Sequence, residues 1–545
     1  MTTTTILFNG PIYTLDPDQP RAQALAIREG RILAVGSEGK VQAAAISGKG
    51  KTEGLNLRGR AVIPGLTDAH LHLLWFGLAA RQVQLGATPN FEAALKMIAD
   101  RAATLPPNAW LLGGGWDQDL WGRAWPTAND LDRVCPNHPA FLVRKDGHSA
   151  WVNRPALALA GIDDQTPDPS NGRIGRDQKG KPNGILVEGA QELIWRILEP
   201  PSPLERLQII QAALTTALSY GLTSLHIAPG VYLRDSHDTL ADLQILRGRG
   251  DLHQRCLLHL ALPDLAAALA LGLRSGFGDR WLRLGNLKLF ADGSLGSETA
   301  ELLQPYENRQ HKGLSIISGE ELSETTHRAI HAGLSVAIHA IGDAANRKAL
   351  DAIERALKPR GPIAAVPAPL ALPNRIEHAM LLDPQDLPRF GALGLIASMQ
   401  PAQVASSLAL AERFLGSRCA QAFAWHDLQE AGVPLAFGSA APSETINPWL
   451  GIHAAVTRQR PNGTPEGGWY PEQRLSLIST LKGYCVGPAL ASSEENLKGK
   501  LKPGMLADLV VLAADPFQVR PAELPAIETD MTIVEGQIVW ERAGS

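Results

Sequence analysis

Two histidines separated by one residue are the strongest candidates for chemistry in this chain. His70 and His72 lie in the segment VIPGLTDAHLHLLWFG, which starts as an apolar strand at 62–66. Side chains two residues apart face the same side of a strand, so both imidazoles would share one face with Asp68. Neutral imidazoles are ligands for zinc and similar divalent metals. The alternative is an HxH pair in a surface loop, but the preceding PGLTDA turn favours a metal site.

Two further histidines come at the ends of apolar segments that we predict to be strands. His339 is the last residue but one of the segment 334–340, and His378 lies in the segment 374–382. Chemistry in an α/β barrel gathers at the C-terminal ends of the strands. A lone histidine at such a position is more often a packed core residue. Two of them, on consecutive strands and downstream of the HxH pair, favour metal ligation.

A lysine inside an apolar strand is a third candidate. Lys288 lies in LRLGNLKLFADGSLGS, and burying its charge there would be costly. Burial lowers the pKa of an amine, and a neutral amine reacts with carbon dioxide to give a carbamate that can bridge two metals. The alternative is a lysine whose amine reaches solvent past the sheet. Taken by itself, the sequence favours that alternative.

The elements that must position these residues alternate between helix and strand. Amphipathic helical segments at 204–221, 321–333 and 419–432 each end at a glycine and are each followed by a short apolar strand. This rhythm predicts an α/β fold with a parallel sheet, and the number of units suits a TIM-type (β/α)8 barrel. We expect that barrel to cover 61–494.

The sequence pattern of both chain ends differs from that of the middle. Short strands broken by Gly, Pro, Asn and Asp occupy 1–60 and 495–545, and we predict that they pair into one composite β-sandwich. A stretch rich in glycine, tryptophan and charged residues interrupts the barrel rhythm at about 84–278. We interpret it as an inserted cap over the barrel mouth.

Composition limits the class of protein. The 545 residues are 45% hydrophobic and 19% charged, with a formal net charge of -4, as expected of a globular protein without a nucleic-acid-binding surface. The four cysteines are far apart, which argues against disulfides and a Cys-rich zinc site. No signal peptide or membrane-spanning run is found, so we expect a cytoplasmic enzyme with no membrane partner.

Several motifs resemble one known family when taken in order. They are PGLTDAHLH, GWDQDLW, DGHSAWVNRPAL, KLFADGSLGSETA, AIHAIGDAAN, RIEHA, FGSAAPSETINPW and LKPGMLADLVVLAADP. Together they resemble the amidohydrolase superfamily, and more narrowly its YtcJ-like branch, which includes N-substituted formamide deformylases. The resemblance covers nearly the whole chain. It implies the barrel and the composite sandwich described above.

The resemblance also implies a set of metal ligands on successive strands. These are His70 and His72 on the first strand, Lys288 as a carboxylated lysine on the fourth, His339 on the fifth and His378 on the sixth. The expected cofactor is one or two divalent ions, zinc in the first place. A homodimer is expected from the family alone.

Candidate substrate-binding residues come from the cap and the barrel loops. His148 in DGHSAW is expected on the substrate side. Glu188 and Asp292 are candidates for the same cavity, although each is individually more typical of a structural residue. The further substrate-binding candidates, from GWDQDLW, are Trp116 and Asp117.

One position departs from the family pattern. The eighth strand of the family usually ends in Gly-Ser-Asp, and its aspartate takes a proton from the attacking water and passes it to the leaving nitrogen. Here Ala440 stands in that place, within FGSAAPSE. Loss of a general acid/base typically lowers the rate about 10²–10⁴-fold. The explanations are a deliberate substitution, a natural loss of activity, or a carboxylate such as Glu444 acting instead; because the other motifs are intact, we favour a deliberately inactivated variant.

The function implied for the aspartate-bearing form is metal-dependent hydrolysis of a C–N bond other than a peptide bond. The substrate would be a small N-substituted or N-acyl amide, with the oxyanion held by the metal and by His148 or His226. Five tryptophans of the cap either line an apolar substrate pocket or pack the cap itself. They are Trp110, Trp116, Trp121, Trp125 and Trp151. A non-catalytic metal- and ligand-binding protein and an esterase on the same scaffold remain alternatives.

Overall fold

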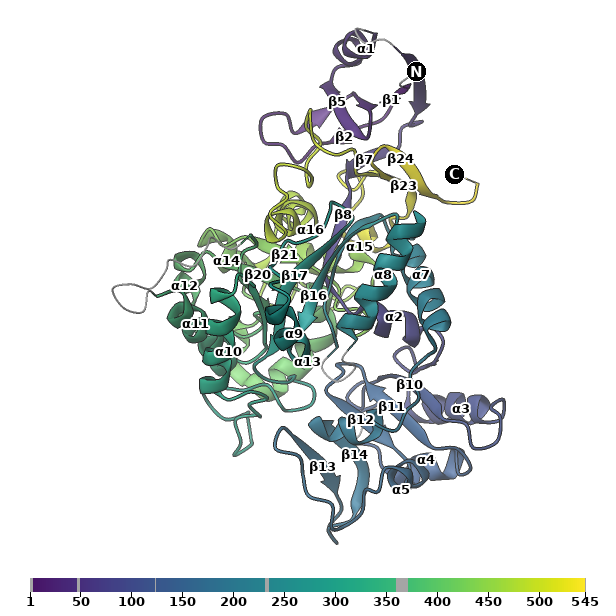
Figure 1. The fold of residues 1–545 in the computed structure, drawn as a ribbon, viewed down its shortest axis with the longest axis vertical. Coiled ribbons are helices and arrows are strands. Elements are labelled where there is room, and N and C mark those ends of the chain that lie inside the picture. Colours follow the sequence, from purple (N-terminus) through teal and green to yellow (C-terminus); the bar gives the residue numbers. More distant parts are fainter. Residues whose placement is uncertain (1–2, 47–49, 123, 231–234, 359–370, 545) are drawn as a thin grey trace.

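A central barrel carries an added unit at each end (Figure 1). The computed structural model describes residues 3–46, 50–122, 124–230, 235–358 and 371–544. In Figure 1 the strand-rich unit formed by both chain ends lies above the barrel, and a cap drawn in blue lies below it. The site expected from the sequence therefore has to be sought where the barrel meets the cap.

The barrel sheet contains eight parallel strands in chain order. They are β8 (Leu66–Leu71), β15 (Leu222–Ile227), β16 (Arg255–Ala261), β17 (Leu282–Phe290), β18 (Val336–Ala340), β19 (Arg375–His378), β20 (Ile396–Met399) and β21 (Leu435–Phe437). These strands are almost wholly buried, which explains their near-continuous apolar runs. The first and last strands meet through the backbone, because the Ala440 N–H donates to the His70 carbonyl at 2.7 Å. The predicted TIM-type α/β fold is confirmed.

Helices surround this barrel (Figure 1). They are α2 (Leu73–Ala79), α7 (Pro203–Ser219), α8 (Ser236–Arg249), α9 (Leu265–Ala270), α10 (Gly319–His331), α11 (Asp343–Leu357), α12 (Leu387–Ala392), α13 (Ala402–Leu415), α14 (Trp425–Glu430), α15 (Pro448–Thr457) and α16 (Leu477–Ala491). Their starts are well specified: Ser202 and Glu205 form a capping box on α7, and Ser318 caps α10. No helix among the described residues is long and apolar enough to cross a membrane.

The cap is a six-stranded sheet with its own core. Its elements are β9 (Val83–Gln84), α3 (Phe91–Ala102), β10 (Leu111–Trp116), α4 (Ala128–Val134), β11 (Ala140–Arg144), β12 (Ser149–Val152), α5 (Arg154–Leu159), β13 (Gly172–Arg176), β14 (Pro182–Glu188), a 3₁₀ turn at Gly189–Gln191 and α6 (Glu192–Trp195). The expected insertion at about 84–278 was too long, because β15 and β16 lie inside that range and are barrel strands. The helix–strand rhythm already returns at α7, the segment that the sequence analysis had counted as a helix followed by a strand, so the cap ends before Pro203.

The two chain ends share one sheet. Its strands are β2 (Ile12–Tyr13), β3 (Arg21–Ala22), β7 (Ala61–Pro64), β22 (Leu509–Leu512), β23 (Thr529–Val534) and β24 (Gln537–Glu541). A second sheet holds β1 (Thr3–Phe8), β4 (Ala24–Arg28), β5 (Arg31–Gly36) and β6 (Lys51–Asn56), with α1 (Glu38–Ile46) beside it. Strands β7 and β22 pair antiparallel, so the N- and C-terminal segments are held together. Arg255 of the barrel pairs with Asp508 at 2.6 Å and ties this unit to the barrel.

Candidate metal and substrate site

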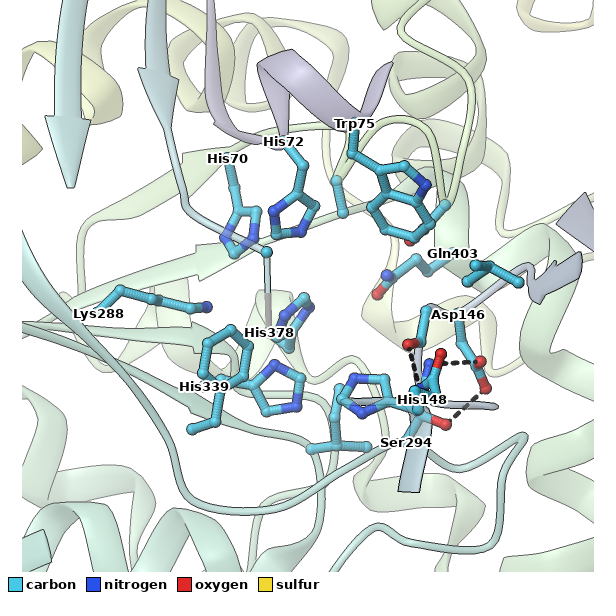
Figure 2. Close-up of a pocket in the computed structure, with 18 of the residues that line it drawn as sticks. His70, His72, Trp75, Asp146, His148, Lys288, Ser294, His339, His378 and Gln403 are labelled. Atoms are coloured by element: carbon cyan, nitrogen blue, oxygen red, sulfur yellow. Dashed lines mark hydrogen bonds between the residues drawn. The ribbon is translucent and has the colours of Figure 1, made fainter. Parts of the chain in front are cut away.

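A cavity opens where the C-terminal ends of the barrel strands meet the cap. Figure 2 shows four histidines and Lys288 on one side of it and residues of the cap and neighbouring loops on the other. The strand-end residues that line it are His70, His72, Lys288, His339, His378 and Ala440. The remaining wall includes Trp75, Asp146, Gly147, His148, Gln191, Trp195, Phe290, Ser294 and Gln403. The cavity thus unites the predicted metal ligands with His148 and with the position of Ala440.

The four strand-end histidines lie side by side. The ring centroids of His70 and His72 are 5.3 Å apart, those of His70 and His378 5.0 Å, and those of His339 and His378 4.5 Å. All four side chains are at most 8% exposed. Rings packed this closely bring their nitrogens toward a common space.

Hydrogen bonds fix one nitrogen of three of these rings and leave the other available. The Nδ1 of His70 donates to Glu377 at 2.5 Å, and the Nδ1 of His72 donates to the Ala228 carbonyl at 3.1 Å. The Nε2 of His339 donates to the Gly293 carbonyl at 2.9 Å. Such bonds select the tautomer of a metal-binding histidine. Among the described residues, the Nε2 of His70 and the Nδ1 of His378 are buried without a hydrogen-bond partner.

Burial keeps these histidines neutral. It lowers the pKa of His70 to about 4, and the pKa values of His72, His339 and His378 lie well below the ordinary range. A neutral imidazole has a free lone pair and is the form that binds metal. The cavity therefore presents ligand-competent rings at neutral pH.

Lys288 reaches the same space from β17. Its side chain is 1% exposed, and its Nζ has no hydrogen-bond partner among the described residues. The Nζ lies 4.5 Å from the centroid of the Phe290 ring. Burial lowers the pKa of Lys288 to about 7, against the opposing charge of Glu377. A substantial fraction of this amine is therefore neutral near pH 7, and the solvent-reaching alternative is not what the structure shows.

Coordination geometry in the cavity is incomplete. Within the described ranges, no group of three or more His, Cys, Asp or Glu side chains is arranged to hold a metal ion. The fit to a metal rests on the donor types and on buried nitrogens without partners. In a metal-bound state these nitrogens would lie at the roughly 2.0–2.1 Å from the ion that is typical of zinc.

Glu377 is a buried carboxylate that orients the His70 ring through a hydrogen bond. It accepts from the His70 ring, and its Oε1 lies 2.5 Å from the Nε of Arg375. Arg375 in turn donates to the Ala69 carbonyl and to Ser398, both at 2.6 Å. Burial opposes the charge of Glu377, but Arg375 and His70 hold its pKa well below the usual range. Its negative charge is thus available to orient His70.

We expect Glu377→Gln to weaken divalent-metal affinity about 10–100-fold, because the ring of His70 loses a charged hydrogen-bond acceptor. Zinc affinity measured by competition with a chelator checks this. Glu494→Gln is the matched control, since Glu494 is also a buried, ion-paired carboxylate but pairs with Lys498 and does not line the cavity. Equal zinc affinities for the two variants would contradict a role for Glu377 in positioning His70.

Ala440 occupies a strained backbone position beside His70. Its φ is 56°, a region that asparagine and aspartate adopt more readily than alanine. Its side chain lines the cavity, and the preceding Ser439 is held by Asp68 at 2.5 Å. Glu444, the suggested substitute carboxylate, pairs instead with Lys145 at 2.7 Å and is not among the described residues lining the cavity.

His148 faces the histidine cluster from the cap. Its ring centroid lies 5.3 Å from that of His339, and its Nδ1 donates to Glu188 at 2.9 Å. Burial acts to lower the pKa of His148, but the charge and hydrogen bond of Glu188 outweigh it, so the pKa is raised. The raised pKa shifts the ring toward its protonated form, which has a second N–H to donate.

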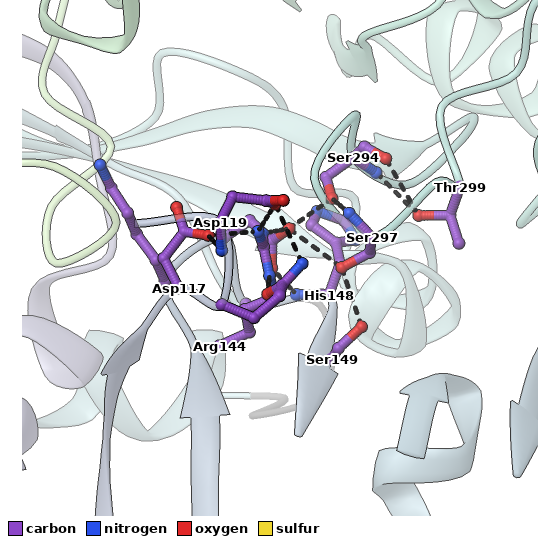
Figure 3. A network of polar contacts seen from close by, with 12 residues as sticks. Asp117, Asp119, Arg144, His148, Ser149, Ser294, Ser297 and Thr299 are labelled. Atoms are coloured by element: carbon purple, nitrogen blue, oxygen red, sulfur yellow. Dashed lines mark hydrogen bonds and ion pairs between the residues drawn. The ribbon is translucent and has the colours of Figure 1, made fainter. Parts of the chain in front are cut away.

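The cap is tied to the barrel by the polar network in Figure 3. Asp146 accepts from Arg144 of the cap at 2.6 Å and from Ser294 and Ser297 of the loop after β17 at 2.6 and 2.9 Å. Ser149 donates to Ser297 at 2.8 Å. These contacts hold His148 in place over the barrel mouth.

Five residues expected at the site do not line the cavity. Trp116 packs in the cap core, and Asp117 pairs with Arg144 at 2.9 Å. Glu188 accepts the hydrogen bond from the Nδ1 of His148 and is not among the described residues that line the cavity. His226 accepts a hydrogen bond from Arg375 at 3.1 Å, and is likewise absent from the described lining.

Asp292 is the fifth of these residues. It is fully buried and accepts the backbone N–H groups of Glu301, Ile341 and Gly342. Burial raises its pKa to about 7. It therefore shapes the loops after β17 and β18; it is not among the described residues that line the cavity, but its Oδ1 lies 3.7 Å from the Nε2 of His339.

The aromatic wall comes from residues that the sequence analysis did not select. Trp116, Trp121, Trp125 and Trp151 belong to the cap core or pack against it, and Trp110 packs against a second cap cluster. The tryptophans lining the cavity are Trp75 and Trp195. Trp75 follows His72 by three residues, one helical turn on, which was a usable signal. No comparable sequence signal marks Trp195, Gln191 or Gln403, because their distance from the histidines depends on how the cap packs against the barrel.

Comparisons with known proteins agree with this geometry. A model of the amidohydrolase family matches residues 53–540. The chain belongs to the amidohydrolase family. The putative amidohydrolase YtcJ of Bacillus subtilis is 33% identical over 99% of both chains, and the protein LONG AFTER FAR-RED 3 of Arabidopsis thaliana is 36% identical over 94% of this chain and 87% of its own length. The N-substituted formamide deformylase of Arthrobacter pascens is 27% identical over 99% of both chains.

A solved structure supports the same assignment. An uncharacterized metal-dependent hydrolase from Pyrococcus horikoshii OT3 superposes with a TM-score of 0.74, at 28% identity over 95% of this amidohydrolase chain and 99% of the other. The predicted membership of the YtcJ-like branch is therefore confirmed. Family membership supports a hydrolase acting on C–N bonds.

Proposed function

We propose that this amidohydrolase binds one or two divalent ions, zinc in the first place, through His70, His72, His339, His378 and a carboxylated Lys288. The main support for this proposal is the group of buried histidines at the strand ends. In three of them one ring nitrogen makes a hydrogen bond, which leaves the other ring nitrogen for a metal ion. Carboxylation joins the neutral Lys288 amine to carbon dioxide as an N–C bond and releases one proton. The resulting anion suits a bridging position between two ions.

We further propose that the substrate is a small N-substituted or N-acyl amide whose C–N bond is hydrolysed. A divalent metal in such a site would activate a water for attack and polarise the scissile carbonyl. The ring of His148 is placed to donate to the developing oxyanion, and Glu188, which accepts from its Nδ1, favours the protonated form of the ring. Trp75, Trp195 and Phe290 give the cavity apolar walls that limit water.

The proton transfer that the family assigns to an aspartate has no side chain to perform it at Ala440. A methyl group neither accepts the proton of the attacking water nor returns it to the leaving nitrogen, so this chain is proposed to be an inactive variant. The same observation favours the second candidate function, a non-catalytic protein that retains metal and ligand. An esterase on the same scaffold is a third candidate.

Metal analysis paired with an amide-hydrolysis assay separates the amide hydrolase from the binding protein. The purified chain and its Ala440→Asp variant are both loaded with zinc, freed of excess ions, and assayed with a broad amide panel. Bound metal in both, with turnover only in the variant, supports the hydrolase. Bound metal with no turnover in either supports the binding protein, and absence of bound metal in both contradicts the proposed site.

A further inference from the structure

A small subsite between the cap and helix α2 lies beside the histidine cluster and is defined by Trp75, Gly147, Gln191 and Trp195, all of which line the cavity. Gln191 and Trp195 are four residues apart on the continuous turn formed by Gly189–Gln191 and α6, so they share one face. Trp75 comes from α2, and its ring centroid lies 5.6 Å from that of His72. The subsite therefore adjoins the proposed metal site.

The two tryptophans are held by packing. Trp195 makes an edge contact with Phe141 at 5.0 Å between centroids, and both Trp75 and Trp195 pack against the same cap cluster. Gly147 leaves room for Trp75, because a Cβ at position 147 would lie 2.9 Å from its ring. The backbone of Gly147 also has φ +80°, which favours glycine. These contacts maintain two apolar surfaces at the subsite.

Gln191 is the polar group of this subsite. Its side chain is 1% exposed, and its Nε2 donates to the Gly147 carbonyl at 3.1 Å. That bond sets the orientation of the amide, since the opposite orientation would place two oxygens against each other. The Oε1 is consequently the atom left buried with no hydrogen-bond partner among the described residues. A buried acceptor in this state favours a ligand that brings a donor.

We propose that this subsite binds the N-substituent side of a secondary amide, with Gln191 accepting a hydrogen bond from the substrate N–H and the two tryptophans holding an apolar N-substituent. The inference rests on the proposed amide hydrolysis and specifies its substrate class. Tertiary amides and esters have no such N–H and leave the Gln191 oxygen unpaired. A site with a buried polar group discriminates strongly against ligands that leave it unpaired.

The test compares three probes that share a benzyl group: N-benzylacetamide, N-benzyl-N-methylacetamide and benzyl acetate. Because this chain lacks the aspartate, binding to the zinc-loaded protein can be measured by calorimetry without turnover. We expect the secondary amide to bind at least about 10-fold more tightly than either of the others. Benzyl acetate separates hydrogen bonding from bulk, since it lacks the N–H without adding a methyl group.

Gln191→Met removes the acceptor and keeps the length of the side chain. It is expected to reduce the preference for the secondary amide over the ester to about 3-fold or less. Gln403→Met is the matched control: Gln403 also lines the cavity but is only partly buried, so the preference is expected to persist. Melting curves establish that each variant is folded, and the probe comparison in the unaltered chain decides the matter if Gln191→Met does not fold.

The subsite and the proposed function fail in different ways. Equal binding of the amide and the ester by the unaltered chain, an undiminished preference in folded Gln191→Met, or no binding of any probe would overturn the subsite. Discrimination in binding, with no turnover by Ala440→Asp, would support the subsite and count against hydrolysis. Turnover by Ala440→Asp without discrimination would overturn the subsite alone.

Discussion

Ala440→Asp is expected to raise the rate of amide hydrolysis about 10²–10⁴-fold over the unaltered chain, because it restores a general acid/base at the reacting centre. The position is prepared for that residue. Its φ of 56° is tolerated better by aspartate than by alanine, and its backbone N–H is already held by the His70 carbonyl at 2.7 Å. Initial rates of the zinc-loaded proteins over a broad amide panel measure the effect.

Ala440→Asn is the matched control for this substitution. Asparagine suits the same backbone conformation and has nearly the same shape, but its amide does not serve as a general base at neutral pH. We expect its rate to stay within about 10-fold of the unaltered chain, given that acid/base catalysis contributes at least about 10²-fold. Equal gains for Ala440→Asp and Ala440→Asn, or no gain for Ala440→Asp on any amide, would contradict the role assigned to this position.

Lys288→Met is expected to have opposite effects on metal binding and on stability. Zinc affinity should fall at least about 100-fold, since loss of a ligand exceeds the 10–100-fold effect of losing its supporting residues. The metal-free protein should become about 1–3 kcal/mol more stable, because a buried amine without a partner is replaced by an apolar chain of similar length. Chelator competition and urea unfolding measure the two effects.

Lys498→Met is the control for Lys288→Met. Lys498 is also buried, but it pairs with Glu494 and donates to Ser224, both at 3.0 Å, so its removal should destabilise the protein and leave zinc affinity unchanged. The same sign of stability change in both variants would contradict the account of Lys288.

The pH dependence of stability gives a second readout for Lys288. Its pKa of about 7 in the folded protein lies below the ordinary value of 10.5. Between these values the unfolded chain binds a proton that the folded chain does not, so this group makes stability rise with pH from about 7 to 10.5. Lys288→Met should reduce that rise in the metal-free protein.

Much of the fold was predictable because barrel strands and helices leave periodic signals. The apolar segments ending at His339 and His378 are β18 and β19, and the helix–strand rhythm gave the correct class. The far boundary of the insertion was predicted too late, although the helical segment at 204–221 and the strand after it already followed the barrel rhythm. The segments of β15 and β16 follow a long cap, and short apolar segments alone do not distinguish a barrel strand from a cap strand.

The residues of the site likewise fall into a group that was predictable from the sequence and a group that was not. Residues fixed by a strand end, such as His70 and Lys288, reach the cavity because the barrel brings all such ends together. Residues whose place depends on the docking of the cap were poorly predicted: Trp116 lies in the cap core, whereas Trp195 and Gln191 line the cavity. His226 also lies on a barrel strand, but it accepts a hydrogen bond from Arg375 and is not among the described residues that line the cavity.

Anomalous X-ray diffraction from crystals of the zinc-loaded chain tests the central claim most directly. The account predicts one or two zinc peaks in the cavity, within about 2.0–2.2 Å of histidine nitrogens from His70, His72, His339 and His378. Density for a carbamate on Lys288 is expected between two such peaks. An ordered cavity with no zinc peak, or zinc bound only elsewhere on the protein, would contradict the account.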